Sequence, residues 1–277
     1  MASTRAQTRP NVAGGTFGSL WLLITIVPIY YIIVTSLRPR SDYYSENPLS
    51  WPANATLQAY RDVLAANFGM YFLNSLVVTV TSVSAVVFVS LLAAYVIVRN
   101  PHRTSRQLFN VLLLGIAIPL QGVIVPVYYL IVQAGLYDTL WAIILPSIAF
   151  AIPLTVLILV NFLRDVPNEL FESMRLDGAT DWRMLWTLVV PLSKPAIITV
   201  AIYDALNVWN GFLFPLILTQ SSDKRVLPLS LWSFQGEFSS NIPAVLAAVV
   251  LSVLPMLAAY AIGRRQLVSG LTAGFTK

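Results

Sequence analysis

The sequence predicts an all-α integral membrane protein that crosses the bilayer six times. Its 277 residues are 57% hydrophobic and only 10% charged, whereas roughly 25% of the residues in an average soluble domain are charged. So few polar residues could not cover the apolar surface of a soluble fold of this length. Helix is the state expected for long apolar runs, because each unpaired backbone N–H or C=O group in lipid costs several kcal/mol.

Uncharged intervals locate the spans, since a helix needs about 20 predominantly apolar residues to cross the hydrocarbon core. Six intervals stand out: Arg9 to Arg38, Asp62 to Arg99, Arg106 to Asp138, Asp138 to Arg164, about Pro195 to Leu218, and Glu237 to Arg264. The fifth contains a single charge, Asp204. The first interval follows two arginines, as a signal peptide would, but it is too long and lacks a cleavage site. We therefore expect it to be a retained helix.

Most Lys and Arg residues fall in alternate connections, on the side that also carries both termini. Two connections hold many of them, the one around residues 99–106 and the one around residues 164–194. Because cytoplasmic loops carry an excess of positive charge, both termini are predicted to be cytoplasmic. The basic residues are scattered between apolar runs rather than gathered in a patch, so we expect no nucleic-acid partner.

Two segments on the opposite side are long enough to contact a partner. Residues 37–68 are expected to form a loop with a short helix near Leu57 to Ala65. Residues 219–240 contain Leu227, Leu229, Trp232 and Phe234, which is unusually apolar for a solvated loop. The sequence leaves two interpretations of this second segment open: it docks to a partner, or it simply packs on the membrane surface.

The connection between the fourth and fifth spans predicts a helical hairpin. Pro167 suits a first helical turn, Glu169 and Glu172 complement the positive end of the helix dipole, and Gly178 can end the helix in a left-handed conformation. Either Thr180 or the residue after it can cap a second short helix. A hairpin held at the cytoplasmic surface would transmit movement into the fifth span.

The spacing within this hairpin carries a family resemblance. Glu172, Gly178 and Pro191 occur at the intervals of the signature Glu-Ala-Ala, three residues, Gly, nine residues, Ile, one residue, Leu, Pro. The positions between them hold residues of similar bulk or polarity: Ser173, Met174, Leu188 and Val190. In this stretch the chain resembles the membrane permeases of binding-protein-dependent ABC importers.

Further motifs resemble the carbohydrate branch of that family, of the MalG type, over about residues 15 to 277. They are Ile118-Pro-Leu-Gln121, Gly135-Leu-Tyr-Asp-Thr139, Asp177-Gly-Ala179, Pro191-Leu-Ser-Lys-Pro195, Trp209-Asn-Gly-Phe212 and Gly270-Leu-Thr-Ala-Gly274. One departure is Gly211, which stands where the family commonly has an acidic residue.

The resemblance implies the transmembrane domain of a type I ABC importer, with six transmembrane helices and a cytoplasmic coupling helix. It implies a cytoplasmic tail (1–14), a first helix with an external loop (15–66), a core transmembrane domain (67–265) and a second cytoplasmic tail (266–277). The coupling helix, about Pro167 to Arg183, would dock on an ATPase subunit. The residues implied for ATPase coupling are Glu169, Glu172, Ser173, Arg175, Asp177, Gly178, Ala179 and Trp182.

The resemblance also implies partners. They are a second, homologous permease subunit, a dimer of ABC ATPase subunits, an extracytoplasmic solute-binding protein and a sugar substrate, a di- or oligosaccharide, in a bacterial inner membrane. No lysine lies in the Gly-Lys-Ser/Thr context of a nucleotide-binding P-loop. We therefore expect no enzyme activity and no cofactor in this chain, with ATP and Mg bound by the partner ATPase subunits. With one histidine and no cysteine, we expect no metal site.

A polar face on the fifth span is the predicted substrate pathway. At about 100° per residue, one arc of the helix collects Tyr203, Asp204, Asn207, Asn210 and Gly211. Amide, carboxylate and aromatic groups suit sugar hydroxyls and C–H faces, and Gln121 is a similar candidate on the third span. The alternative is that Asp204 and the asparagines only join helices by hydrogen bonds.

An ion-coupled secondary transporter is the alternative function. That class often shows repeated halves and several intramembrane carboxylates. This chain has no detectable repeat, and Asp204 is the only acidic residue inside an expected span. The importer subunit is therefore the favoured interpretation.

Overall fold

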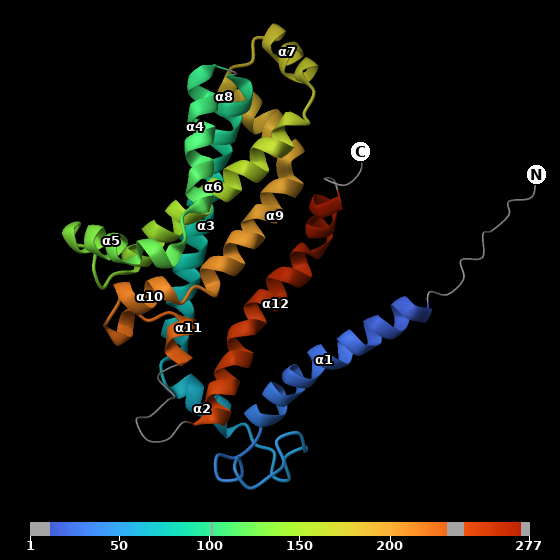
Figure 1. Cartoon of the computed structure of the whole chain (residues 1–277), viewed down its shortest axis with the longest axis vertical. Coiled ribbons are helices and arrows are strands. Elements are labelled where there is room, and N and C mark those ends of the chain that lie inside the picture. Colours follow the sequence, from blue (N-terminus) through green and yellow to red (C-terminus); the bar gives the residue numbers. More distant parts are fainter. Residues whose placement is uncertain (1–11, 101, 232–240, 273–277) are drawn as a thin grey trace, which may run out of the picture. The chain divides into compact units, whose positions relative to one another are not determined.

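The computed structural model describes residues 12–100, 102–231 and 241–272, and within them it has helices and loops but no strand. The prediction of an all-α fold is confirmed. The helices in chain order (Figure 1) are α1 (Val12–Ser36), α2 (Gln58–Ala65), α3 (Phe68–Arg99), α4 (Arg103–Leu114), η1 (Gly115–Ala117), α5 (Leu120–Gln133), α6 (Leu140–Arg164), α7 (Asn168–Leu176), α8 (Asp181–Met184), η2 (Leu185–Val189), α9 (Val190–Trp209), α10 (Leu213–Leu218), η3 (Ser222–Lys224), α11 (Leu227–Ser230) and α12 (Ile242–Thr272).

Three predicted features lie wholly or partly outside the described residues. Residues 1–11 of the expected N-terminal tail and residues 273–277 of the expected C-terminal tail are outside, as are Trp232 and Phe234 of the second external segment. The short helix expected near Leu57 to Ala65 is present as α2.

Four helical stretches within the described residues are long and apolar enough to cross a membrane: Gly14–Ser36, Phe68–Arg99, Leu140–Arg164 and Asp181–Trp209. A fifth crossing results if the pair Arg103–Ala117 and Leu120–Gln133, bent by 106°, is one broken span. The apolar helix Ile242–Ala258 is shorter than these spans. The count of six crossings therefore remains a prediction.

Proline explains why the third predicted span is bent rather than straight. Ile118, just before Pro119, has an extended backbone with φ −80° and ψ 112°. The ring of a proline clashes with a preceding residue in helical conformation, so helices end before it. η1 stops at Ala117 for this reason, and α5 begins afresh at Leu120.

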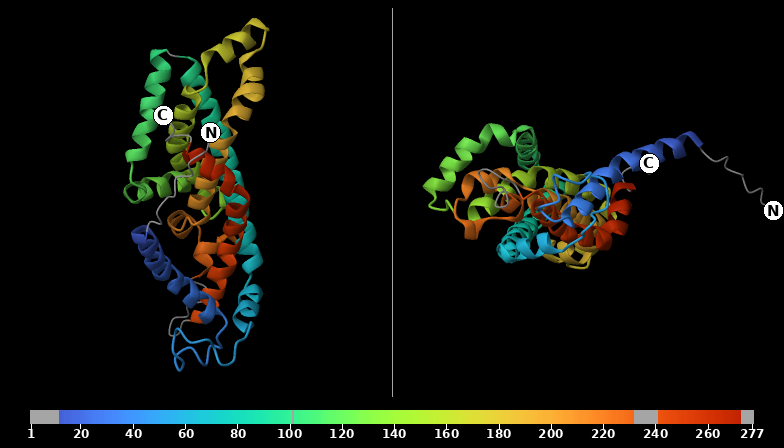
Figure 2. Two further views of the ribbon diagram at one scale, coloured as in Figure 1. Left: turned by 90° about the vertical axis from the view of Figure 1, so that its right-hand side faces the viewer. Right: turned by 90° about the horizontal axis from the view of Figure 1, so that it is seen from below.

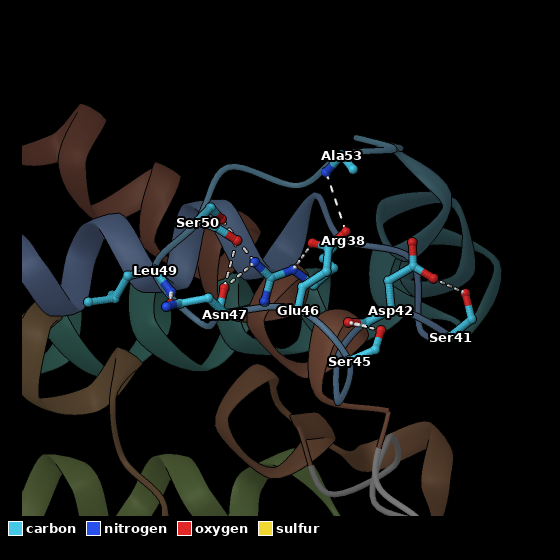
Figure 3. Close-up of polar contacts among 9 residues, drawn as sticks. All are labelled: Arg38, Ser41, Asp42, Ser45, Glu46, Asn47, Leu49, Ser50 and Ala53. Atoms are coloured by element: carbon cyan, nitrogen blue, oxygen red, sulfur yellow. Dashed lines mark hydrogen bonds and ion pairs between the residues drawn. The ribbon is translucent and has the colours of Figure 1, made fainter.

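The chain divides into two compact units. The first comprises residues 1–66 and 234–251, and the second comprises residues 67–233 and 252–277. In the first unit the loop after α1 is organised by the buried side chain of Arg38 (Figure 3). Its Nε lies 3.1 Å from Glu46 Oε2, and its Nη2 donates hydrogen bonds to the carbonyl oxygens of Asn47 and Ser50 at 3.0 and 2.9 Å. One guanidinium thus fixes the course of residues 38–50.

The second unit is built around α3, α6 and α9. α3 and α6 pack along each other more extensively than any other pair of elements. Ser82 and Ser90 on α3 are fully buried, and such small side chains let helices approach closely in a membrane. A core cluster at the hairpin end of the unit includes Leu159 of α6 and Met184 of α8, both with no exposed surface.

The turn between α5 and α6 is tied to the segment after α10 by Asp138. Its carboxylate accepts hydrogen bonds from the backbone N–H groups of Gln220 and Ser221 at 2.8 and 2.9 Å and from the Ser221 hydroxyl. Its own N–H donates to the Leu218 carbonyl oxygen at 3.0 Å. These bonds, led by that from the Ser221 hydroxyl, lower the pKa of Asp138 below its ordinary value of 3.8.

Asp138→Asn tests this tie. Asparagine also tolerates the left-handed backbone found at Asp138 (φ 60°), but it loses the charge-assisted bonds, so we expect a loss of about 1 kcal/mol of stability. Folding lowers the pKa of this carboxyl below its ordinary value of 3.8, so the ionised group stabilises the folded state at any pH above 3.8. That stabilisation is lost as the pH falls through the still lower pKa of the folded state. Thermal unfolding of both proteins in detergent should differ at pH 6, and the difference should shrink as the pH falls below about 4. An unchanged difference at low pH would contradict this account.

Candidate functional site

The hairpin predicted from the sequence is formed by α7 and α8, and it projects past the end of α3 (Figure 2). α7 ends where Gly178 adopts φ +77°. The Gly178 N–H donates to the Arg175 carbonyl oxygen at 3.1 Å, and the Ala179 N–H donates to that of Met174 at 2.9 Å. This is the glycine-terminated helix end expected from the sequence.

Thr180 caps α8, and the neighbouring acid has a different role. The Thr180 hydroxyl accepts a hydrogen bond from the Arg183 N–H at 3.3 Å. Asp181 Oδ1 instead accepts from Arg175 Nη2 at 2.9 Å and from the Tyr95 hydroxyl at 3.1 Å. Asp181 therefore joins both arms of the hairpin to the end of α3.

A second contact from α3 holds the start of α7. Arg99 Nη1 donates a hydrogen bond to Asn168 Oδ1 at 2.8 Å. The same guanidinium lies 4.0 Å from the centroid of the Phe171 ring, the one buried side chain of α7, and such a cation–π contact adds to the attachment. Sequence reasoning did not select Tyr95 or Arg99, because their partners lie about 70 to 90 positions away in the chain.

The second arm of the hairpin continues without interruption into the apolar helix α9. α8, η2 and α9 form one helical stretch, Asp181–Trp209, which is 29 residues long. η2 is π-helical over Leu185–Val189 and precedes Pro191. Because a proline lacks the N–H that would bond to the preceding turn, Pro191 accounts for the wider π-helical turn just before it. Movement of the hairpin would therefore reach α9 directly.

Seven of the eight residues implied for ATPase coupling have exposed side chains or backbone, and Ala179 is half-buried. The exposed ones are Glu169, Glu172, Ser173, Arg175, Asp177, Gly178 and Trp182. Leu176, which sequence reasoning did not select, is 89% exposed at the end of α7. This combination of acidic, basic and apolar side chains is an accessible surface for another protein.

A cavity of about 540 Å³ lies between the start of α5, the first part of α6, the end of α9 and the start of α10. It is lined by five of the six residues predicted for the pathway: Gln121, Tyr203, Asp204, Asn207 and Gly211. The sixth, Asn210, is not in the lining, and its Nδ2 donates to the Leu206 carbonyl oxygen of its own helix at 2.8 Å. The structure adds Ser147, Phe150 and Phe212 to the lining.

Asp204 combines both roles considered from the sequence. It lines the cavity, yet it is only 2% exposed. Its Oδ2 accepts a hydrogen bond from the buried Thr155 hydroxyl of α6 at 2.8 Å. The carboxylate therefore joins α9 to α6 and also faces the cavity.

Trp209 lies on the other side of α9. Its ring packs edge-on against Phe72 with centroids 5.8 Å apart, and its Nε1 donates to the Ser252 carbonyl oxygen at 3.1 Å. It is 4% exposed, so it packs helices. Among the described residues there is no group of three His, Cys, Asp or Glu side chains placed to hold a metal ion.

Gly178→Ala tests the turn of the hairpin. No atom lies within 4 Å of an added Cβ, so the left-handed backbone (φ +77°) is the source of strain, at about 1–2 kcal/mol. We expect the hairpin to be cleaved faster by a protease. Gly69→Ala is the matched control, since that glycine is helical and also has open space. Equal cleavage of both variants would exclude a special role for the turn.

Comparison with known proteins agrees with this geometry. Residues 86–267 match the family described as "Binding-protein-dependent transport system inner membrane component". A permease protein of an ABC transporter from Caldicellulosiruptor sp. (strain Rt8B.4) is 37% identical over 94% of this chain and 95% of its own length. The diacetylchitobiose uptake system permease protein NgcG of Streptomyces coelicolor is 32% identical over 92% and 85%.

Two further comparisons extend the match. The melibiose/raffinose/stachyose import permease protein MelC of Bacillus subtilis is 30% identical over 91% of both chains. A crystal structure of a bacterial ABC transporter involved in the import of the acidic polysaccharide alginate contains a chain of the same fold, with TM-score 0.81, 20% identity and coverage of 96% of this chain and 99% of that one. The chain is therefore a multi-pass inner membrane protein that belongs to the family of binding-protein-dependent transport system inner membrane components.

Proposed function

We propose that this chain is the sugar-translocating permease subunit of a bacterial ABC importer, powered by separate ATPase subunits that bind ATP and Mg. The observation that carries the proposal is the continuous stretch Asp181–Trp209. At one end it forms an arm of the exposed hairpin, and toward the other it supplies Asp204 and Asn207 to the cavity. One element thus joins a docking surface for a motor to the wall of a solute site.

The lining of the cavity supports a sugar as the solute. Gln121 and Asn207 offer amide groups, Ser147 and Tyr203 offer hydroxyls, and the rings of Phe150, Phe212 and Phe214 offer apolar faces. Sugars need such a mixture, since their hydroxyls form hydrogen bonds and their C–H faces pack on rings. The names of two relatives, which specify di- and oligosaccharides, support the same class of solute.

The proposed assembly contains a second, related permease subunit, a dimer of ATPase subunits and an external solute-binding protein. The hairpin α7–α8 would lie in the cytoplasm with both termini, in accord with the distribution of Lys and Arg. Residues 15–66 would supply the first helix and an external loop, and residues 67–265 the core domain. The tails would be residues 1–14 and 266–277, the second of them directed toward the ATPase dimer.

The docking surface can be tested by cross-linking, because the chain contains no cysteine. Ser173→Cys places one thiol on the exposed face of α7, and Ser222→Cys places one on exposed η3. In the assembled transporter we expect the thiol at residue 173 to cross-link to an ATPase subunit and the thiol at residue 222 to leave it unmodified. A cross-link from residue 222 alone would reverse the proposed orientation.

The solute site can be tested with Asp204→Ala in proteoliposomes that contain the complete transporter. We expect ATP-driven sugar uptake to fall about 10-fold or more, the equivalent of one lost charged hydrogen bond, while the subunits still assemble. Thr155→Val is the matched control, since it removes the bond between α6 and α9 and leaves the carboxylate. Asp204 only joins helices if both variants impair assembly to the same extent and the transporters that do assemble take up sugar at the rate of the parent. Uptake driven by an ion gradient without ATP would instead indicate a secondary transporter.

A further inference from the structure

We infer that α3 is a rigid link between the hairpin α7–α8 and residues 223–227 at its opposite end, so that both move together. This inference rests on the proposed function, because it concerns how the work of the ATPase would reach the far side of the membrane. Within it, Asn74, Tyr95 and Arg99 are positioning residues: none of them is in the lining of the cavity between α5, α6, α9 and α10, and they attach the two ends of α3 to their neighbours.

The C-terminal end of α3 is attached to both arms of the hairpin. The buried Tyr95 donates its hydroxyl to Asp181 at 3.1 Å, next to the ion pair between Asp181 and Arg175 at 2.9 Å. One turn later Arg99 donates to Asn168 at 2.8 Å and covers the ring of Phe171. The start of α7 and the start of α8 are therefore both held to one helix.

The N-terminal end of α3 is attached to the segment that contains η3 and α11. Asn74 Nδ2 donates to the carbonyl oxygens of Asp223 and Arg225 at 2.8 and 2.9 Å. The hydroxyl of the buried Ser75 accepts the Leu227 N–H at 2.8 Å. Leu227 is 1% exposed, and α11 packs on α3. Three hydrogen bonds and a buried side chain thus fix residues 223–227 to this helix.

α3 is well suited to transmit movement along its axis. At about 1.5 Å per residue, its 32 residues extend about 48 Å, which is enough to cross a bilayer. Of the four long apolar helices described, α1, α6 and α9 contain proline and α3 contains none. Sharp kinks in helices arise at such residues, so α3 is the span least able to absorb a displacement by bending.

The consequence is a second route for movement besides α9. A displacement of the hairpin that entered only α9 would meet η2, Pro191 and Pro195 before it reached the cavity. Through Tyr95 and Arg99 the same displacement would also enter α3 and reach residues 223–227. Rigid secondary elements, together with packed side chains and hydrogen-bond networks, carry energetic coupling between distant sites. Residues 223–227 would then respond to the ATPase on the opposite face of the membrane.

A fluorescent probe at residue 222 tests the link. Ser222→Cys gives a single exposed thiol in a chain without cysteine, and it is labelled before assembly with the partner subunits. We expect addition of ATP and Mg to shift the emission of the probe. Three single substitutions should each remove most of that shift: Arg99→Ala and Tyr95→Phe at the C-terminal end of α3, and Asn74→Ala at its N-terminal end. Tyr95→Phe keeps the ring and removes one hydrogen bond, so a folding defect would not explain its effect.

Two matched controls accompany these variants. Arg106→Ala removes an exposed arginine of α4, and Asn54→Ala removes an exposed asparagine; both should leave the shift unchanged. A full shift in Arg99→Ala and Asn74→Ala, or no shift in the parent transporter, would overturn the inference. ATP-driven sugar uptake by the parent, measured in the same preparation, decides the proposed function separately, since uptake without any shift at residue 222 would leave that function intact.

Discussion

The attachment of the hairpin α7–α8 to the end of α3 is the interaction on which the rest of the structure depends. α7 has nine residues and buries only Phe171, so its own packing gives the first arm of the hairpin little support. Short helices gain their stability from tertiary contacts rather than from intrinsic propensity. Asp181 and Arg99 supply those contacts, and they turn a surface loop into a rigid projection from the membrane domain.

Local chemistry made the hairpin, the polar face of α9 and the long apolar helices predictable. Gly178 ends α7 because only glycine readily takes φ +77°, and that requirement is visible in the sequence. Tyr203, Asp204, Asn207 and Gly211 share a face through the period of the helix, and they do line one cavity. The family resemblance, confirmed by the comparisons, rests on the same local spacing.

Contacts between distant parts of the chain were not predictable in this way. Thr155 and Asp204, or Asn74 and Asp223, carry no mutual signal in a single sequence, because their pairing follows from how α3, α6 and α9 pack. The position of Asn210 outside the cavity lining was not predictable for a related reason. The ideal helical arc includes it, but the backbone leaves the regular helix at this residue, where φ is −87° and ψ is 0°.

The break before Pro119 has a consequence for hydration. A helix that ends inside a membrane leaves backbone groups without intrahelical partners, and such groups are tolerated only where protein or water can reach them. Leu120 and Gln121, the first residues of α5, line the cavity. Water that solvates this exposed turn would occupy the same space as a passing solute. A molecule rich in hydroxyl groups could then exchange its hydration shell step by step, without the full cost of entering a dry interior.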